Sequence, residues 1–80
     1  MNLLGRHVVW EKMSGKSNAS MSRAHGSGTL IRLFLGEGMV IDGEEGFITS
    51  KIVKLEAFDD GVEVTTKNSK YFVGLKSNEI

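Results

Sequence analysis

Two groups of residues have the types that a phosphate-binding site or a metal site requires. Their spacing in the sequence excludes both kinds of site. Gly15-Lys16-Ser17 matches the end of a phosphate-binding P-loop, but that motif needs a glycine five residues before its Gly-Lys pair, where this chain has Trp10. The two histidines, His7 and His25, are 18 residues apart, whereas zinc takes three or four ligands from close pairs. We therefore expect no metal and no cofactor.

The carboxylates gather in two short segments, DGEEG at 42–46 and FDDG at 58–61. The first lacks the ligand spacing and the closing glutamate of a calcium loop, and the second is typical of a turn. The sequence contains neither a cysteine nor a G-x-S-x-G nucleophile motif. We therefore expect a protein without catalytic activity.

A serine- and glycine-rich segment at 13–28, MSGKSNASMSRAHGSG, is the main candidate for recognition. Cationic side chains, hydroxyls and exposed backbone N–H groups suit a phosphate-bearing ligand or the acidic surface of a protein partner. The Trp10 ring at the base of this segment is suited to stacking, and Tyr71 offers a further apolar anchor. The predicted binding residues are Trp10, Lys12, Lys16, Arg23, His25, Arg32 and Tyr71.

The length of 80 residues predicts one domain, 1–80, and a hydrophobic content of 40% predicts that it is globular. A domain of this size gains little more from apolar burial than it loses in conformational entropy, so we expect a homo-oligomer. No apolar run is long enough to span a membrane, and the N-terminus does not resemble a secretion signal. We therefore expect a cytoplasmic protein that does not bind membranes.

The net charge of zero is unevenly distributed along the chain. Residues 1–36 hold five basic residues and one acidic residue, whereas residues 37–80 hold five basic and nine acidic residues. This asymmetry indicates an anionic partner for the first half or head-to-tail packing of copies. Nucleic acid receives only weak support as that partner, because the net charge is zero and aromatic residues are few.

Regularly spaced glycines in the second half separate short β-branched and aromatic runs, a pattern typical of an all-β sandwich or barrel. We predict five to six antiparallel strands in a small barrel or sandwich, SH3-like or similar. A first strand at 3–12 is followed by a long flexible loop at 13–28 and a β-meander at 29–75. The apolar run at 29–35 predicts a strand covered on both faces, or one that pairs by its edge with another copy.

The strongest predicted element is a hairpin with arms at 47–58 and 62–66. Alternating residue types give each arm one apolar and one polar face. The residues predicted to face the core are Val53, Leu55, Ala57, Val62 and Val64. Asp59-Asp60-Gly61 supplies the turn, with the glycine free to adopt a positive φ. Lys67-Asn68-Ser69 is predicted as a second turn, because asparagine tolerates the left-handed region.

Residues 48–74 resemble a pattern found in small proteins of phages and mobile elements. The similarity lies in Thr49-Ser50 and in Val64-x-Thr66-x-Asn68-Ser69-x-Tyr71. It implies a compact β-protein that a phage makes to bind and block a host component.

The leading hypothesis is therefore a non-catalytic binding protein, a phage-encoded inhibitor of a host or defence protein that acts through its cationic loop in the host cytoplasm. One alternative is a protein that sequesters a nucleotide between protomers. Another is a structural subunit of an assembly.

Overall fold

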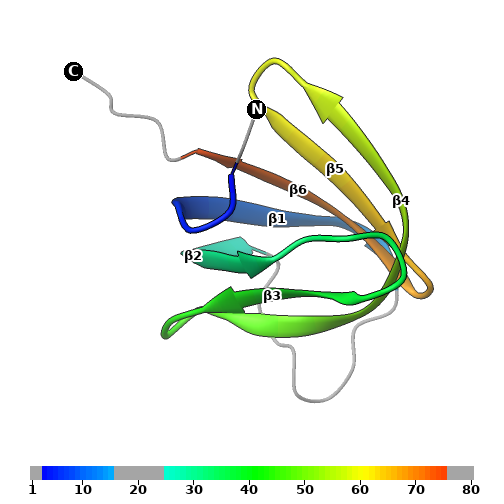
Figure 1. Cartoon of the computed structure of the whole chain (residues 1–80), viewed down its shortest axis with the longest axis horizontal. Coiled ribbons are helices and arrows are strands. Elements are labelled where there is room, and N and C mark those ends of the chain that lie inside the picture. Colours follow the sequence, from blue (N-terminus) through cyan, green and yellow to red (C-terminus); the bar gives the residue numbers. More distant parts are fainter. Residues whose placement is uncertain (1–2, 16–24, 76–80) are drawn as a thin grey trace.

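The computed structural model describes residues 3–15 and 25–75, and all regular secondary structure in these ranges is β-strand (Figure 1). The strands are β1 (His7–Gly15), β2 (His25–Arg32), β3 (Gly38–Asp42), β4 (Phe47–Phe58), β5 (Gly61–Thr66) and β6 (Ser69–Leu75). Each strand is antiparallel to the next, and β1 pairs with β6, so the six strands form a closed barrel. The predicted all-β fold is confirmed.

The interior of the barrel is filled by side chains from all six strands. The buried core residues are Leu3, Val8, Trp10, Leu30, Met39, Ile41, Ile52, Val62, Val64, Tyr71 and Val73. Trp10, Phe47 and Tyr71 form an aromatic cluster with ring centroids 4.4–6.4 Å apart. Because these side chains fill the interior, recognition of a partner has to use the outer surface.

The first two strands differ from the prediction. β1 begins at His7 and continues to Gly15, and β2 begins at His25, so residues 13–15 and 25–28 of the predicted loop are strand. Polar and small residues in these two stretches can form strand because the pairing of β1 with β2 and β6 uses backbone hydrogen bonds. Residues 16–24, the rest of that loop, lie outside the described residues.

The apolar run at 29–35 is only partly a strand. β2 ends at Arg32. Thr29 pairs with both β1 and β3, and Leu30 and Arg32 pair with β3, with a register shift between them at Ile31. Phe34 and Leu35 lie beyond the strand and are exposed. Because the barrel is closed, β2 has a neighbouring strand on both sides and is not an edge strand, so the fold gives no support to the expected edge pairing between copies through this segment.

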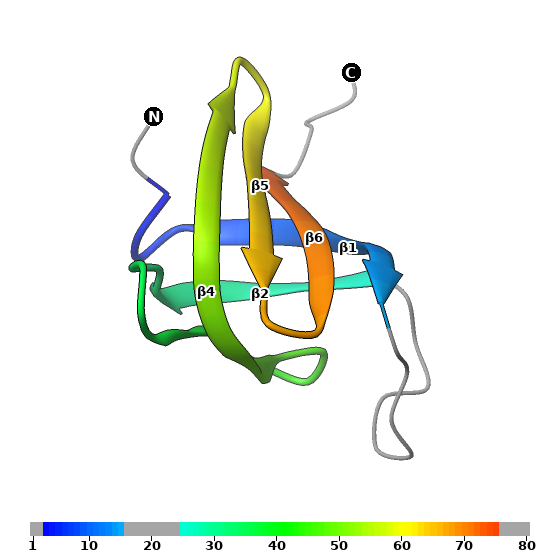
Figure 2. The ribbon, with the colours of Figure 1, turned by 90° about the vertical axis from the view of Figure 1, so that its right-hand side faces the viewer.

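The long strand β4 bends as it passes from β3 to β5 (Figure 2). Its register with β5 shifts between Ile52 and Lys54, which is a β-bulge. The bulge reverses the alternation, so that Ile52 is buried and Val53 is 57% exposed. The prediction that Val53 faces the core is therefore wrong, whereas Val62 and Val64 of β5 are buried as predicted.

Neither of the two predicted turns, at 59–61 and 67–69, uses a positive φ, since within the described residues only Gly5, Gly36 and Gly43 have one. Gly61 is needed for close approach instead, because a Cβ there would lie 2.7 Å from the ring of Phe72. The turn between β5 and β6 is held by the buried hydroxyl of Thr66, which bonds the backbone of residues 68 and 69.

Candidate functional site

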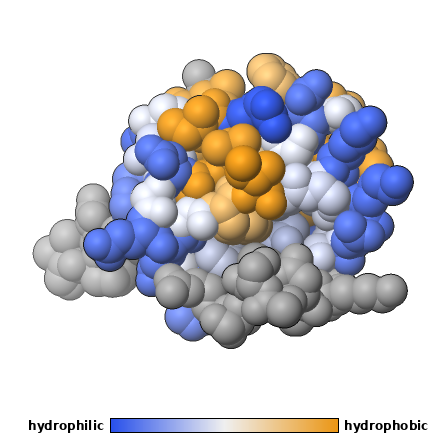
Figure 3. All heavy atoms as spheres, turned by 90° about the horizontal axis from the view of Figure 1, so that it is seen from below, coloured by the Kyte–Doolittle hydropathy of each residue, from blue (hydrophilic) through white to orange (hydrophobic). Residues whose placement is uncertain are grey.

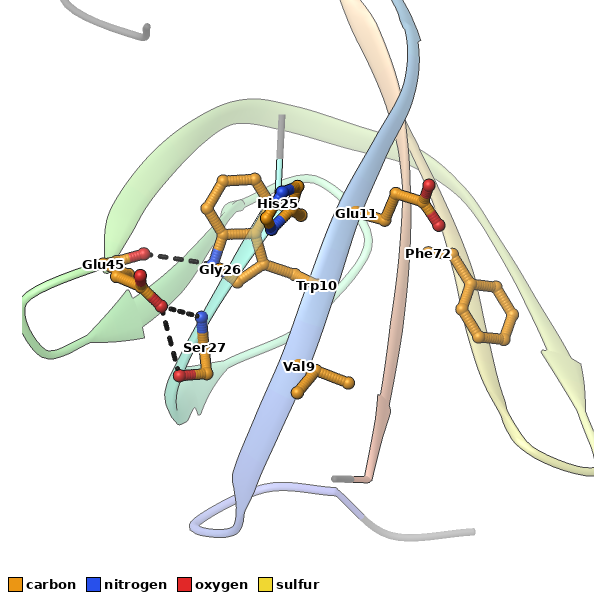
Figure 4. Close-up of a pocket in the computed structure, with 8 residues that line it drawn as sticks. All are labelled: Val9, Trp10, Glu11, His25, Gly26, Ser27, Glu45 and Phe72. Carbon is orange, nitrogen blue, oxygen red and sulfur yellow. Dashed lines mark hydrogen bonds between the residues drawn. The ribbon is translucent and has the colours of Figure 1, made fainter. Parts of the chain in front are cut away.

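An open groove runs over the outer face of β1. Val8 and Trp10 point into the core, so Val9 and Glu11 point outward, because successive side chains alternate along a strand. The groove has a volume of about 500 Å³ (Figure 4). Its lining residues are Val9, Trp10, Glu11, His25, Gly26, Ser27, Glu45 and Phe72. We call it the β1 groove.

Strand register explains why these side chains meet. Glu11 lies opposite His25 of β2 and opposite Phe72 of β6. Val9 lies opposite Ser27 on one side and opposite Gly74 on the other. The outward side chains of three strands therefore border one hollow.

Two glycines allow the Phe72 ring to lie flat on the barrel. Gly61 and Gly74 face each other across β5 and β6, and a Cβ on either would touch this ring, at 2.7 Å and 3.5 Å respectively. The ring also packs against Phe58 at 6.3 Å. Val9 lies opposite Gly74 and lines the groove together with Phe72, so Val9, Phe72 and Phe58 form an apolar strip that leads out of the β1 groove.

The other wall is built by Glu45 from the turn between β3 and β4. Pairing with β3 starts only at Thr29, so the N-terminal part of β2 has no strand on that side. The Glu45 carboxylate takes the place of a strand there, accepting hydrogen bonds from the Ser27 N–H at 2.8 Å and the Ser27 hydroxyl at 3.2 Å. The Trp10 indole N–H donates to the Glu45 carbonyl at 3.0 Å.

A second hollow, of about 300 Å³, adjoins the first and shares Ser27 and Glu45 with it. It is also lined by Asp42 and Glu44, and by His7. Carboxylates therefore line both hollows, and each contains one histidine. Within the described ranges no group of three acidic or histidine side chains is arranged to hold a metal ion.

Two of the predicted binding residues are core residues. Trp10 is 3% exposed and Tyr71 is 4% exposed, and both rings pack against Phe47. Burial raises the pKa of Tyr71 above its usual value of 10.0, and a hydrogen bond with Ser69 opposes this rise. The sequence had suggested that these rings stack on a partner or anchor it. Because both are buried, neither ring is free to do so.

Of the remaining predicted residues, the three in the described ranges are not gathered into one site. His25 is exposed and lines the β1 groove, whereas Arg32 lies at the opposite end of β2. Arg32 donates to the Gly38 carbonyl at 2.9 Å and pairs with Glu37 at 3.7 Å. Lys12 is half-buried in β1, and Lys16 and Arg23 lie outside the described residues.

Sequence reasoning missed most of the groove. The alternation of Val8 and Trp10 with Val9 and Glu11 was a usable signal for the outward pair. No local pattern indicated Glu45, whose contacts with Ser27 join residues 18 apart in the sequence.

Comparison with family models, curated proteins and solved structures finds no match for this chain. None of the described residues forms a helix of the length and apolar character needed to cross a membrane.

Proposed function

We propose that the protein is a non-catalytic binding protein that docks on another polypeptide through the outer surface of its barrel. The observation that carries this proposal is the β1 groove with the apolar strip that leads out of it. Val9 and Phe58 of that strip are 37% and 45% exposed. Covering such side chains with a partner removes apolar surface from water, which favours association.

A nucleotide is a poorer candidate ligand for the described hollows. Glu11 and Glu45 line one of them, and Asp42, Glu44 and Glu45 line the other. Phosphate groups at these positions face charges of the same sign, which disfavours binding. The charge pattern therefore supports a polypeptide ligand over a phosphate-bearing one at this surface.

The role of the serine- and glycine-rich segment at 13–28, the cationic segment, stays a prediction. Lys16 and Arg23 are its central charges, and an acidic patch on a host or defence protein is the partner that they would suit. The origin in a phage rests on the resemblance of residues 48–74 alone. We retain the inhibitor of a host protein as the biological form of the proposed binding function.

A second surface supports the proposed self-association. Arg32, Val40 and Ile48 lie opposite one another on the outer face of β2, β3 and β4. Ile48 of β4 is 69% exposed, and Ile31, which precedes Arg32 in β2, is 53% exposed. Apolar side chains gather on this side of the molecule (Figure 3). A second copy covering them would supply the burial that an 80-residue chain lacks.

The binding proposal is tested by affinity capture from cells that contain the natural partner, with Val9→Asp and Val53→Asp as matched variants. Both side chains are exposed valines, but only Val9 lines the groove. We expect Val9→Asp to lose the partner that wild type and Val53→Asp retain. Equal capture by all three proteins would overturn the groove as the binding surface.

Two further variants separate the other surfaces. The double variant Lys16→Glu/Arg23→Glu loses the partner if the cationic segment makes the contact. In sedimentation, Ile48→Lys shifts a wild-type dimer to monomer if β2–β4 is the self-association face. Large assemblies of the wild-type protein alone would favour a structural subunit instead.

A further inference from the structure

We infer that the β1 groove receives an arginine side chain from a partner segment that also carries an apolar residue. This inference rests on the proposed function, because it specifies the chemistry of the polypeptide that docks there. It is drawn from one row of outward side chains that crosses five strands. The row reads His25, Glu11, Phe72, Glu63 and Glu56, from β2 through β1, β6 and β5 to β4.

The three glutamates of this row differ in their ion pairs. Glu56 and Glu63 lie opposite each other, which is unfavourable for two like charges. Each is compensated by a lysine of its own strand or the next: Lys54 lies 3.9 Å from Glu56, and Lys70 lies 3.7 Å from Glu63.

Glu11, the exposed glutamate beside the groove, forms no ion pair with any residue of the described ranges. Its neighbours in the row are an imidazole, on His25, and an aromatic ring, on Phe72. The glutamates of the row on β4 and β5 are thus each paired with a lysine. The glutamate on β1, where the groove lies, has no cationic partner in the described part of the chain. A cation from a partner completes the row.

The apolar part of the groove makes arginine the better fit than a small cation. Val9 and the Phe72 ring lie beside Glu11, and Figure 4 shows Glu11 and Phe72 on the same side of β1. The aliphatic stem of a long basic side chain packs on apolar surface while its charged head stays in water. A guanidinium also stacks on an aromatic face, which an ammonium does less well.

The strip beyond the groove accounts for the apolar neighbour. From Phe72 it continues to Phe58, whose ring lies 6.3 Å away. In an extended partner segment, side chains two positions apart point to the same side. A segment with arginine at one position and an aliphatic or aromatic residue two positions on therefore contacts Glu11 and the apolar strip together.

The test uses the full chain, isotope-labelled for amide NMR, and two blocked peptides. The first is acetyl-Gly-Arg-Ser-Leu-Gly-amide, and the second carries neutral citrulline, which has nearly the same shape, in place of arginine. We expect the arginine peptide to shift the amide signals of Val9, Glu11 and Phe72. The citrulline peptide is expected to bind about two- to fivefold more weakly, as an exposed charge pair allows.

Matched protein variants locate the charge. Glu11→Gln is expected to bind the arginine peptide as weakly as wild type binds the citrulline peptide. Glu56→Gln removes the same charge from the same row, outside the groove, and is expected to bind like wild type. Both glutamates are exposed on strands, so their replacement by glutamine leaves the core unchanged.

Each contrary outcome has a defined meaning. Equal binding of the two peptides, no binding of either, or equal weakening by Glu11→Gln and Glu56→Gln would overturn the inference. The proposed function fails separately, if Val9→Asp still captures the natural partner. If Val9→Asp loses that partner while the two peptides bind equally, the groove remains a docking surface and the arginine preference is wrong.

Discussion

Replacing Thr66 by valine removes one hydroxyl group that holds the turn between β5 and β6. Thr66 is 4% exposed. Its Oγ1 accepts hydrogen bonds from the N–H groups of Asn68, at 3.3 Å, and Ser69, at 3.1 Å, and donates to the Ser69 carbonyl at 3.1 Å. A hydroxyl offers one donor and two acceptor sites, so all three are used.

The expected loss follows from these three bonds. Each contributes about 0.5–1.5 kcal/mol net to stability, and the 3.3 Å bond is counted at the lower end of that range. Valine keeps the branched shape and leaves no large cavity. We therefore expect Thr66→Val to lower the free energy of unfolding by about 2–3 kcal/mol. For a domain of this size that corresponds to a decrease in Tm of roughly 10–20 °C.

Thr66→Ser is the control, because it keeps the hydroxyl and removes only a buried methyl group. Its expected loss is about 0.8 kcal/mol. Urea unfolding, followed by far-ultraviolet circular dichroism and by Trp10 fluorescence, measures both variants, and an unchanged m-value identifies a pure stability change. Equal losses in the two variants, or a loss below about 1 kcal/mol for valine, would show that the hydroxyl does not hold the turn.

Three further perturbations test other parts of the barrel. Gly61→Ala places a Cβ against the Val73 carbonyl, so we expect a loss of about 1–3 kcal/mol in urea unfolding, and wild-type stability would contradict the close approach. The folded-state pKa of Tyr71 is raised above 10.0 by burial, so its stabilisation is complete below pH 10 and is lost as the pH rises through the folded-state value. Unfolding measured from pH 8 to 11 should therefore show a decline that Tyr71→Phe reduces, and an identical decline in that variant would refute the assignment. Trp10→Phe removes the N–H that bonds the Glu45 carbonyl at 3.0 Å, and we expect a loss of at least about 1 kcal/mol. An unchanged midpoint in thermal unfolding would mean that this bond does not stabilise the turn.

Some elements of the fold could be predicted because their signals are local. In the hairpin of β4 and β5, Val62 and Val64 alternate with polar neighbours, and this alternation fixes which face of β5 is buried. The Asp59-Asp60 pair marks the reversal of the chain because its side chains favour turns. These properties depend on residues adjacent in the sequence.

The candidate site was much less predictable. The Trp10 and Tyr71 rings suggest surface anchors by type, but the barrel needs large side chains to fill its interior and buries both. Serine and glycine in 13–28 suggest a loop, yet Gly26 lies in a strand where a side chain would collide with Glu45 and Trp10. The small residue there reflects a crowded position.

The sequence alone determined that the chain forms short antiparallel strands separated by turns, since the two-residue period of a strand and the chemistry of a turn are written in neighbouring residues. Only the tertiary structure decided that β1 closes on β6, that a bulge turns Val53 outward, and that Glu11, His25 and Phe72 share one groove. Register across strands sets these outcomes, and it follows from the packing of the whole barrel.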